Sequence, residues 1–214
     1  MNIWFFILTG FLVGLGIKQI VNWLNIEGFR LDNRNLILEL LNGLAWWWAY
    51  SNLNYNESFI FVMIFGILSG ISIIDMNTFQ IPLIFIILGC IFIILDFSIN
   101  EISFPNVFWG IFIGSILPLF IIGFLWLITK GQGMGFGDIQ LGFVLGAWLG
   151  PLRMAITLFT ASLLSLLFWV ITSFFKGFNK DRAIPMAPFL SISAVGVFIG
   201  SFYFPNLFQL LVLK

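Results

Sequence analysis

The sequence predicts an all-α fold, a polytopic membrane helix bundle, and three observations support this prediction. Of the 214 residues, 61% are hydrophobic and only 8% are charged, with a mean hydropathy of +1.11, whereas soluble domains carry about 25% charged residues. The apolar residues form runs of roughly 20, which is long enough for a helix to cross a bilayer. Small residues recur four positions apart within these runs, a spacing that lets membrane helices approach closely. We therefore expect residues 1–214 to form a single integral membrane domain.

The apolar runs predict about eight transmembrane helices, within a range of seven to nine. The first run, MNIWFFILTGFLVGLG, has no basic residue before Lys18, so we expect an uncleaved span rather than a signal peptide. The sixth and eighth runs are short, and the sixth is expected to be tilted or to start within the membrane. In order, the predicted helices are 3–24, 36–53, 58–75, 81–97, 104–129, 139–151, 154–175 and 188–204.

The distribution of Lys and Arg predicts that the N-terminus lies outside. With that orientation, only Arg153 and Lys214 fall on the outer side, and the positive-inside rule favours such an excess of inner charge. Segments 73–82 and 130–138 then both lie at the cytoplasmic face. The seven residues assigned to inner loops are Lys18, Arg30, Arg34, Lys130, Lys176, Lys180 and Arg182.

The recurring small residues predict tight helix packing, because glycine lets two backbones approach closely in lipid. The sets are Gly10/Gly14, Gly66/Gly70, Gly110/Gly114, Gly196/Gly200 and the triple Gly142/Gly146/Gly150.

The composition excludes several kinds of chemistry. The chain has no histidine, and its one cysteine, Cys90, lies inside an apolar run, which excludes His/Cys zinc sites, Cys–His nucleophilic pairs and internal disulfides. The formal net charge is zero, so nothing indicates nucleic-acid binding. We expect no metal and no cofactor, and any reaction must use carboxylates, hydroxyls, Lys/Arg or backbone groups.

Two aspartates, Asp75 and Asp138, are the candidates for such a reaction. Asp75 ends the third predicted span, and Asp138 opens the sixth; a carboxylate at the bilayer centre costs on the order of 3 kcal/mol, and less near the interface. One interpretation is structural, with both residues interfacial and Asp138 favoured by a helix N-terminus. The functional interpretation is an aspartyl protease dyad, in which two carboxylates share one proton and act as base and acid on a peptide bond.

The segment KGQGMGFGD, residues 130–138, precedes the sixth span and has glycine at every second position from 131 to 137. Such a segment offers free backbone N–H and C=O groups to an extended peptide. It matches neither GxGxxG nor a phosphate-binding P-loop, so nucleotide binding is not expected.

Four segments together resemble the type IV leader peptidases, or prepilin peptidases, among the GxGD membrane aspartyl proteases. GMGFGD with IQLGFVLGAWLG resembles the glycine–aspartate motif of that family, and Asp75 to Pro82 matches its D-x(5)-I/L-P motif. IPMAPFL (184–190) and RNLILELLNGL (34–44) resemble two further motifs. The four motifs occur in the order found in that family and span roughly residues 34–200.

The resemblance implies a peptidase that removes the short basic leader of prepilins or pseudopilins at the cytoplasmic face of the bacterial inner membrane, usually after glycine. The implied partners are these substrates and the lipid bilayer. Asp75 and Asp138 would be catalytic. Arg34 and Glu39 match recurrent positions for which helix packing is the simpler role. The implied supporting residues are Gly133, Gly135, Gly137, Lys130, Pro82, Pro185 and Pro188.

One region departs from the family pattern. Many members carry a large cytoplasmic loop with two C-x-x-C pairs after the first helix and also methylate the new N-terminus. Here that loop is only residues 25–35 and has no cysteine, which is too short for an independent zinc domain. N-methyltransferase activity is therefore not expected.

Two alternative functions remain open from the sequence. A presenilin-like intramembrane protease also uses GxGD, but would cut within a residual helix rather than at a basic leader. A small transporter or an assembly scaffold would use its carboxylates as proton or ion sites.

Overall fold

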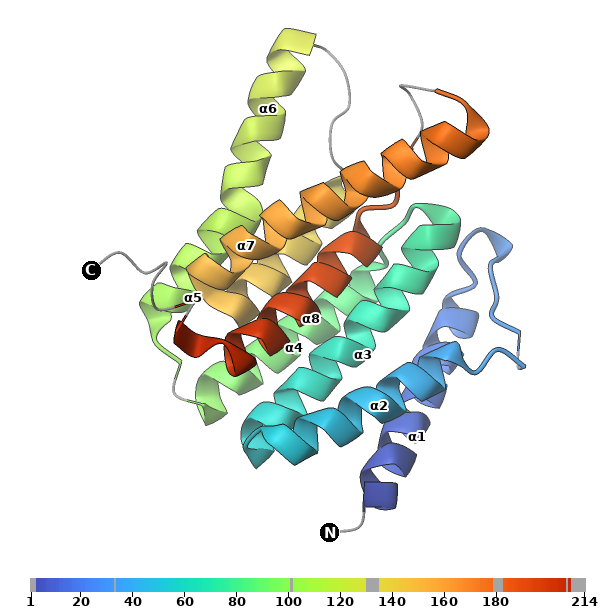
Figure 1. Ribbon diagram of the computed structural model, residues 1–214, viewed down its shortest axis with the longest axis vertical. Helices are drawn as coiled ribbons and strands as arrows, with labels where there is room; N and C mark the ends of the chain where they lie inside the picture. The colour runs from blue at the N-terminus through green and yellow to red at the C-terminus, as the bar shows by residue number, and fades with distance from the viewer. Residues whose placement is uncertain are drawn as a thin grey trace. The chain divides into compact units, whose positions relative to one another are not determined.

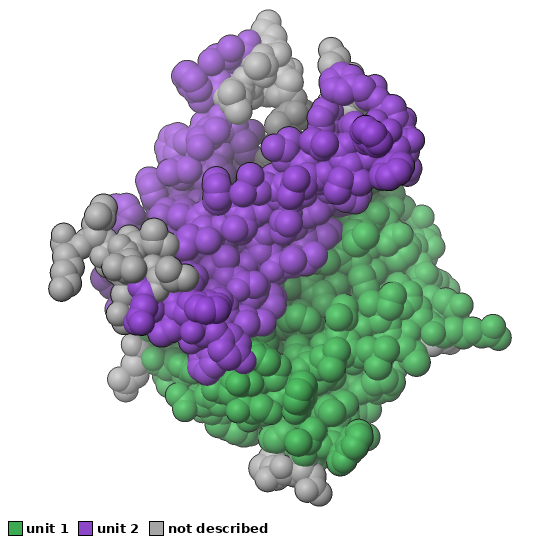
Figure 2. Space-filling view, viewed as in Figure 1, with its two compact units in different colours: residues 1–102 green, residues 103–214 purple. Residues whose placement is uncertain are grey.

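The computed structural model describes residues 3–32, 34–100, 102–129, 135–178, 183–206 and 208. Within these residues every regular element is a helix and there is no strand, which confirms the all-α prediction. The chain divides into two compact units, Met1–Ile102 and Ser103–Lys214 (Figure 2).

Unit 1 contains four α-helices and one short 3₁₀ turn (Figure 1). Helix α3 packs against α1, α2 and α4 and is the most buried of them, with a core that includes Phe61, Ile64, Leu68 and Ile71. It runs one turn past the predicted end at residue 75. The elements are α1 (Ile3–Leu24), η1 (Ile26–Gly28), α2 (Ile37–Asn52), α3 (Tyr55–Thr78) and α4 (Leu83–Ile99).

Glycines hold α1 against α2. A Cβ atom added at Gly10 would lie 2.6 Å from the Asn42 carbonyl oxygen, and one added at Gly14 would lie 2.5 Å from Cα of Glu39. No side chain fits at such distances, so the packing prediction is confirmed for this pair. Ile17 of α1 packs against Gly66 of α3 in the same way, because a Cβ atom added at Gly66 would lie 2.7 Å from Cδ1 of Ile17.

Unit 2 begins with one continuous helix whose middle is a π-helical segment. Pro118 explains the wide turn, because proline has no N–H and its ring would clash with the carbonyl four residues earlier in a regular α-helix. The elements of this unit are α5 (Phe104–Ile111), η2 (Phe112–Ile116), α6 (Leu117–Thr129), α7 (Phe136–Lys176) and α8 (Ala187–Tyr203).

Helix α7 contains a break at Gly150, where φ is 74° and ψ is 177°. This conformation is essentially restricted to glycine. The chain reverses direction there, so that the arms before and after Gly150 run in opposite directions (Figure 1). The sequence predicted two helices in this region, 139–151 and 154–175. The structure has two helical arms there, one on each side of Gly150, which agrees with the two predicted helices, although the predicted total of eight helices is not confirmed.

Glycine also determines helix contacts in unit 2. Cβ atoms added at Gly110 and Gly114 would overlap the backbones of Gly146 and Gly142 in the first arm of α7, as the spacing predicted. The prediction is wrong for Gly196 and Gly200 of α8, because an added Cβ at either position meets nothing within 4 Å among the described residues.

Four helical stretches of the described chain are long and apolar enough to span a membrane, namely α1, α3, Phe104–Phe124 and α7. Helices α4 and α8 are shorter but also apolar. These helices identify an integral membrane protein.

Candidate active site

Asp75 lies in the last turn of α3, with only 5% of its surface exposed. The helix ends because Phe79 adopts a left-handed conformation, with φ of 54°, and its N–H donates to the Asp75 carbonyl oxygen at 3.0 Å. Pro82 follows as the buried N-cap of α4. The D-x(5)-I-P segment is therefore the short connection that carries the chain from a buried carboxylate into the next helix.

Asp138 lies in the first turn of α7 and is half-buried. Its N–H donates to the Gly135 carbonyl oxygen at 3.1 Å, and its Oδ2 accepts from the Gly135 N–H at 3.2 Å. Gly135 is the N-cap, and Gly137 is the second helical residue. The structural interpretation of Asp138 as a helix N-terminal residue is thus confirmed, and it is compatible with a catalytic role.

The glycine face of α7 begins one turn after this carboxylate. Gly142 and Gly146 follow Asp138 at intervals of four residues, which places all three on the same side of the helix. The two glycines contact Gly114 and Gly110 directly. The backbone that carries Asp138 is therefore anchored to the α5–η2 segment by contacts that leave no space for side chains.

The remaining predicted residues flank α8 or lie in the glycine loop. Pro185 precedes α8 and is half-buried, and Pro188 is its second residue and is buried. Lys130 and Gly133 lie outside the described residues. Asp75 and Pro82 belong to unit 1, whereas Asp138 and the other described candidates belong to unit 2. The pairing of the two aspartates therefore remains a prediction.

The short loop between α1 and α2 contacts the segment that follows Asp75, a feature that the sequence did not indicate. Gln80 Nε2 donates to Glu27 Oε1 at 2.7 Å. The loop backbone is constrained around this bond, with left-handed φ values of 44° at Asn25 and 50° at Glu27. The loop thus holds the Asp75–Pro82 connection through a side-chain bond between residues far apart in the sequence.

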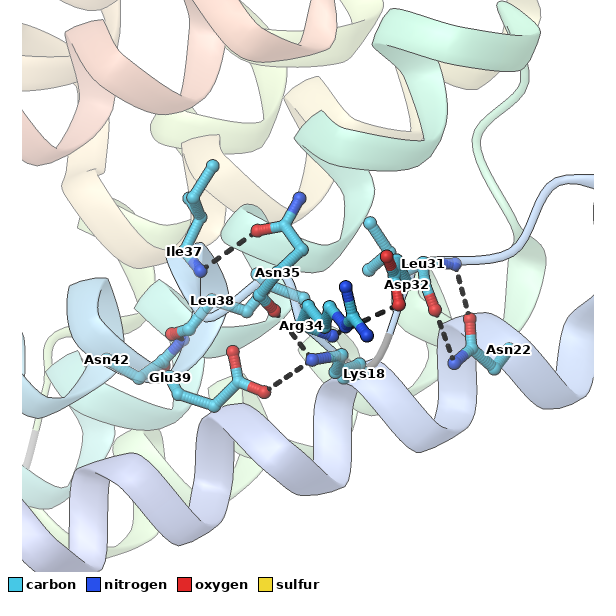
Figure 3. A network of polar contacts seen from close by, with 10 residues as sticks. All are labelled: Lys18, Asn22, Leu31, Asp32, Arg34, Asn35, Ile37, Leu38, Glu39 and Asn42. Carbon is cyan, nitrogen blue, oxygen red and sulfur yellow. Dashed lines mark hydrogen bonds and ion pairs between the residues drawn. The ribbon is translucent and has the colours of Figure 1, made fainter.

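A buried ion pair joins α1 to α2 (Figure 3). Lys18 Nζ lies 2.9 Å from Glu39 Oε1 and donates to the Asn35 carbonyl oxygen at 2.6 Å. Lys18 is 5% exposed and Glu39 is 0% exposed. The assignment of Lys18 to an inner loop is therefore wrong, because the residue lies within α1 and pairs with Glu39 of α2.

The same network fixes the loop that connects these helices. The Asn22 side chain donates to the Leu31 carbonyl oxygen at 3.2 Å and accepts from the Leu31 N–H at 2.7 Å (Figure 3). Arg34 contributes its backbone N–H, which donates to Asp32 Oδ1 at 3.1 Å, while its side chain is exposed. Glu39 therefore has a structural role here, as its helical position suggested.

A family model described as the type IV leader peptidase family matches residues 59–170, just over half of the chain. The matched region includes both aspartates, Pro82 and the glycine loop. It does not include the motif-like segments 34–44 and 184–190.

Individual relatives agree with this match. A protein of Stutzerimonas stutzeri named prepilin leader peptidase/N-methyltransferase is 25% identical over 187 residues, which cover 81% of this chain and 63% of the relative. A protein of Aeromonas salmonicida with the same name is 36% identical over 67 residues, covering 31% of this chain and 23% of the relative.

A third relative, from Escherichia coli O78:H11, is named type 4 prepilin-like proteins leader peptide-processing enzyme. It is 26% identical over 187 residues, which cover 82% of this chain and 67% of the relative. No solved structure matches the chain significantly. The chain thus spans less than two thirds of the length of the first two relatives. On the family match across residues 59–170, the chain belongs to the type IV leader peptidase family.

Proposed function

We propose that this protein is a membrane aspartyl endopeptidase that removes the short basic leader of type IV prepilins or pseudopilins, usually by cutting after glycine. The observation that carries the proposal is that Asp75 and Asp138, the only aspartates that match the family motifs, both lie within the matched region. The names of the relatives, which refer to prepilin leader processing, support the substrate class.

The two carboxylates have different roles in this proposal, and their helix positions supply the reason. Asp138 is in the first turn of α7, where the helix dipole and a backbone N–H favour a negative charge. Asp75 is buried in the last turn of α3, where the helix dipole disfavours a negative charge. The proposed dyad shares one proton between its two carboxylates, and we take Asp138 as the base and Asp75 as the acid.

The reaction follows from these two states. Asp138 takes a proton from a water molecule while the water oxygen attacks the carbonyl carbon of the scissile peptide bond. Asp75 gives its proton to the departing amine nitrogen as the C–N bond breaks. The glycine residues at 135 and 137 leave room beside Asp138 for the substrate backbone to approach closely, and Gly133, Lys130, Pro82, Pro185 and Pro188 support the substrate-binding segments.

The proposal places the protein in the bacterial cytoplasmic membrane with its N-terminus outside and both aspartates at the cytoplasmic side. It does not extend to N-methyl transfer. Within the loop, Leu31 is bonded to Asn22 and Glu27 is bonded to Gln80, and a segment of about this length cannot fold an additional domain.

The test is a comparison of three aspartate variants in proteoliposomes that contain a prepilin. We expect Asp75→Asn and Asp138→Asn to lower the cleavage rate by about 10²–10⁴-fold, the usual contribution of a general acid or base. Asp96→Asn is the matched control, because Asp96 is also 5% exposed but lies near the C-terminal end of α4, at the predicted outer side. Wild-type cleavage by either of the first two variants would disprove the dyad assignment.

The same liposomes separate the proposal from the transporter alternative. Proton flux that is lost in Asp138→Asn, together with no cleavage of prepilin by the wild-type protein, would favour a proton-coupled carrier. Cleavage within a substrate helix, instead of at a basic leader, would favour a presenilin-like protease.

A further inference from the structure

The loop between α1 and α2 contacts the end of α3 that carries Asp75 (Figure 1). One side-chain hydrogen bond extends this contact into the α3–α4 connection, where Gln80 Nε2 donates to Glu27 Oε1 at 2.7 Å. Gln80 lies between Asp75 and Pro82 in the sequence, and the Gln80 and Glu27 side chains are both exposed. The bond therefore places a surface carboxylate beside the segment that follows a candidate catalytic residue.

The backbone of η1 also fixes the position of Glu27. Glu27 has φ of 50° and ψ of 27°, and Asn25 before it has φ of 44°, a left-handed conformation that is unfavourable for residues other than glycine. The Phe29 N–H donates to the Ile26 carbonyl oxygen at 2.8 Å and closes the turn. The Glu27 side chain is therefore oriented by the turn as well as by Gln80.

Glu27 differs from the other acidic side chains at this end of unit 1. Glu39 is 0% exposed and is paired with Lys18, and Asp75 is 5% exposed. Asp32 is exposed, but its Oδ1 accepts a backbone N–H and the residue lies between two arginines in the sequence. Glu27 is exposed and forms no ion pair within the described part of the chain. It is therefore the acidic group here that is both held in place and accessible to a cation.

The hydrogen bond to Gln80 does not by itself require a charge at position 27. A neutral amide oxygen would accept from Gln80 as well, whereas a carboxylate has about four acceptor sites, of which this bond uses one. The closest cation along the loop, Arg30, donates its Nε to Asn25 Oδ1 at 3.0 Å instead. The remaining acceptor sites of Glu27 suit an ammonium or guanidinium group, which forms charge-assisted hydrogen bonds with a carboxylate.

We propose that Glu27 is a specificity-determining residue that binds one lysine or arginine of the substrate leader. This inference rests on the proposed function, in which the leader is short and basic. Glu27 holds that basic side chain beside the Asp75–Pro82 connection, while Gln80 keeps the carboxylate in place. Because the ion pair forms at the surface, its contribution is modest, and it acts on the binding of the leader and not on the chemical step.

Kinetics in proteoliposomes test the inference with a basic-leader prepilin and with variants in which one basic leader residue at a time is replaced by glutamine. Glu27→Gln removes the charge and keeps an oxygen that accepts from Gln80. We expect this variant to raise KM for the basic leader about two- to fivefold, with kcat unchanged. For one leader variant, Glu27→Gln should have no further effect, because both substitutions remove the same ion pair.

Asp32→Asn is the matched control, because it also removes one exposed carboxylate from this loop and keeps the acceptor for the Arg34 N–H. It should leave KM unchanged for every leader. An unchanged KM in Glu27→Gln, a loss confined to kcat, or effects that add for every leader variant would overturn the inference and leave the proposed peptidase activity intact. Failure of the wild-type protein to cleave the basic-leader prepilin would instead disprove the proposed function, and this inference with it.

Discussion

Asp75 and Asp138 occupy opposite ends of helices, and this difference has energetic consequences. The dipole of α7 stabilises charge on Asp138, and that of α3 destabilises it on Asp75. Asp138 therefore contributes to the stability of its helix, whereas a charged Asp75 would weaken α3.

The Lys18–Glu39 pair leads to a stability prediction. Lys18→Met leaves the fully buried Glu39 carboxylate without its cation, and we expect this to lower the free energy of unfolding by about 3–5 kcal/mol. The double variant Lys18→Met/Glu39→Leu removes both charges and should recover most of that loss, because an apolar pair needs no desolvation. Unfolding in mixed micelles, followed by far-UV circular dichroism, measures the free energy of unfolding of the single and the double variant.

Arg34→Ala is the control for this pair, since the Arg34 side chain is exposed and uses only its backbone N–H in the network. It should leave the unfolding midpoint unchanged. If the double variant were as unstable as Lys18→Met alone, the ion pair would be contributing more than charge compensation, and our interpretation of it would be wrong.

The sequence singled out two candidate catalytic residues, but it did not reveal the buried ion pair. Asp75 and Asp138 were evident because a carboxylate next to an apolar span is unusual. Lys18 was misassigned because its position near the predicted end of the first span suggested a loop residue. Its partner Glu39 lies 21 residues away, and only the packing of α1 on α2 shows that the two meet.

Contacts between glycines hold the first arm of α7 to the α5–η2 segment, and they lead to a second prediction. A methyl group at Gly146 would overlap the backbone of Gly110. We expect Gly146→Ala to lower the free energy of unfolding by about 1–3 kcal/mol and, by moving Asp138, to lower peptidase activity. The unfolding midpoint and the cleavage rate are the two measurements.

Gly196→Ala is the matched control, because it also adds one methyl group to a glycine within a helix. Its added Cβ meets no atom of the described residues within 4 Å, and alanine is the better helix former by about 1 kcal/mol. We expect no loss of stability or activity. A similar loss in both variants would show that the effect comes from the helix backbone and not from the contact with α5.

Most helices could be predicted from the sequence, because an apolar run long enough to cross a bilayer has few stable structures there other than a helix. Their bounds agree with the structure within a few residues for α1, α2, α4 and α8. The extra turn of α3 was missed because the apolar run ends at the charged Asp75. The reversal near residue 150 was predicted, because the apolar runs 139–151 and 154–175 indicate two successive spans. The π-helical segment was missed because it depends on backbone angles that an apolar run does not specify.

The orientation of the whole molecule in the membrane gives a third prediction. In a Cys90→Ala background, we expect an impermeant maleimide to label Gln80→Cys only from the cytoplasmic side and Asn54→Cys only from the outer side. Both positions are exposed and lie at opposite ends of α3. Right-side-out and inverted membrane vesicles provide the two measurements. The reverse labelling pattern would contradict the N-out orientation and place Asp75 outside.

The reversal at Gly150 has a consequence for the surrounding lipid. The first arm of α7, residues 136–149, is roughly 20 Å long at about 1.5 Å per residue, whereas the hydrocarbon layer of a bilayer is about 30 Å thick. A helix that is shorter than the hydrocarbon layer requires either a locally thinner bilayer or a solvent-filled depression of the protein surface above the end of the helix. In either case, the thickness of the host membrane sets how far Asp138 lies below the lipid headgroups. On the proposed function, this depth also sets how readily the attacking water reaches Asp138.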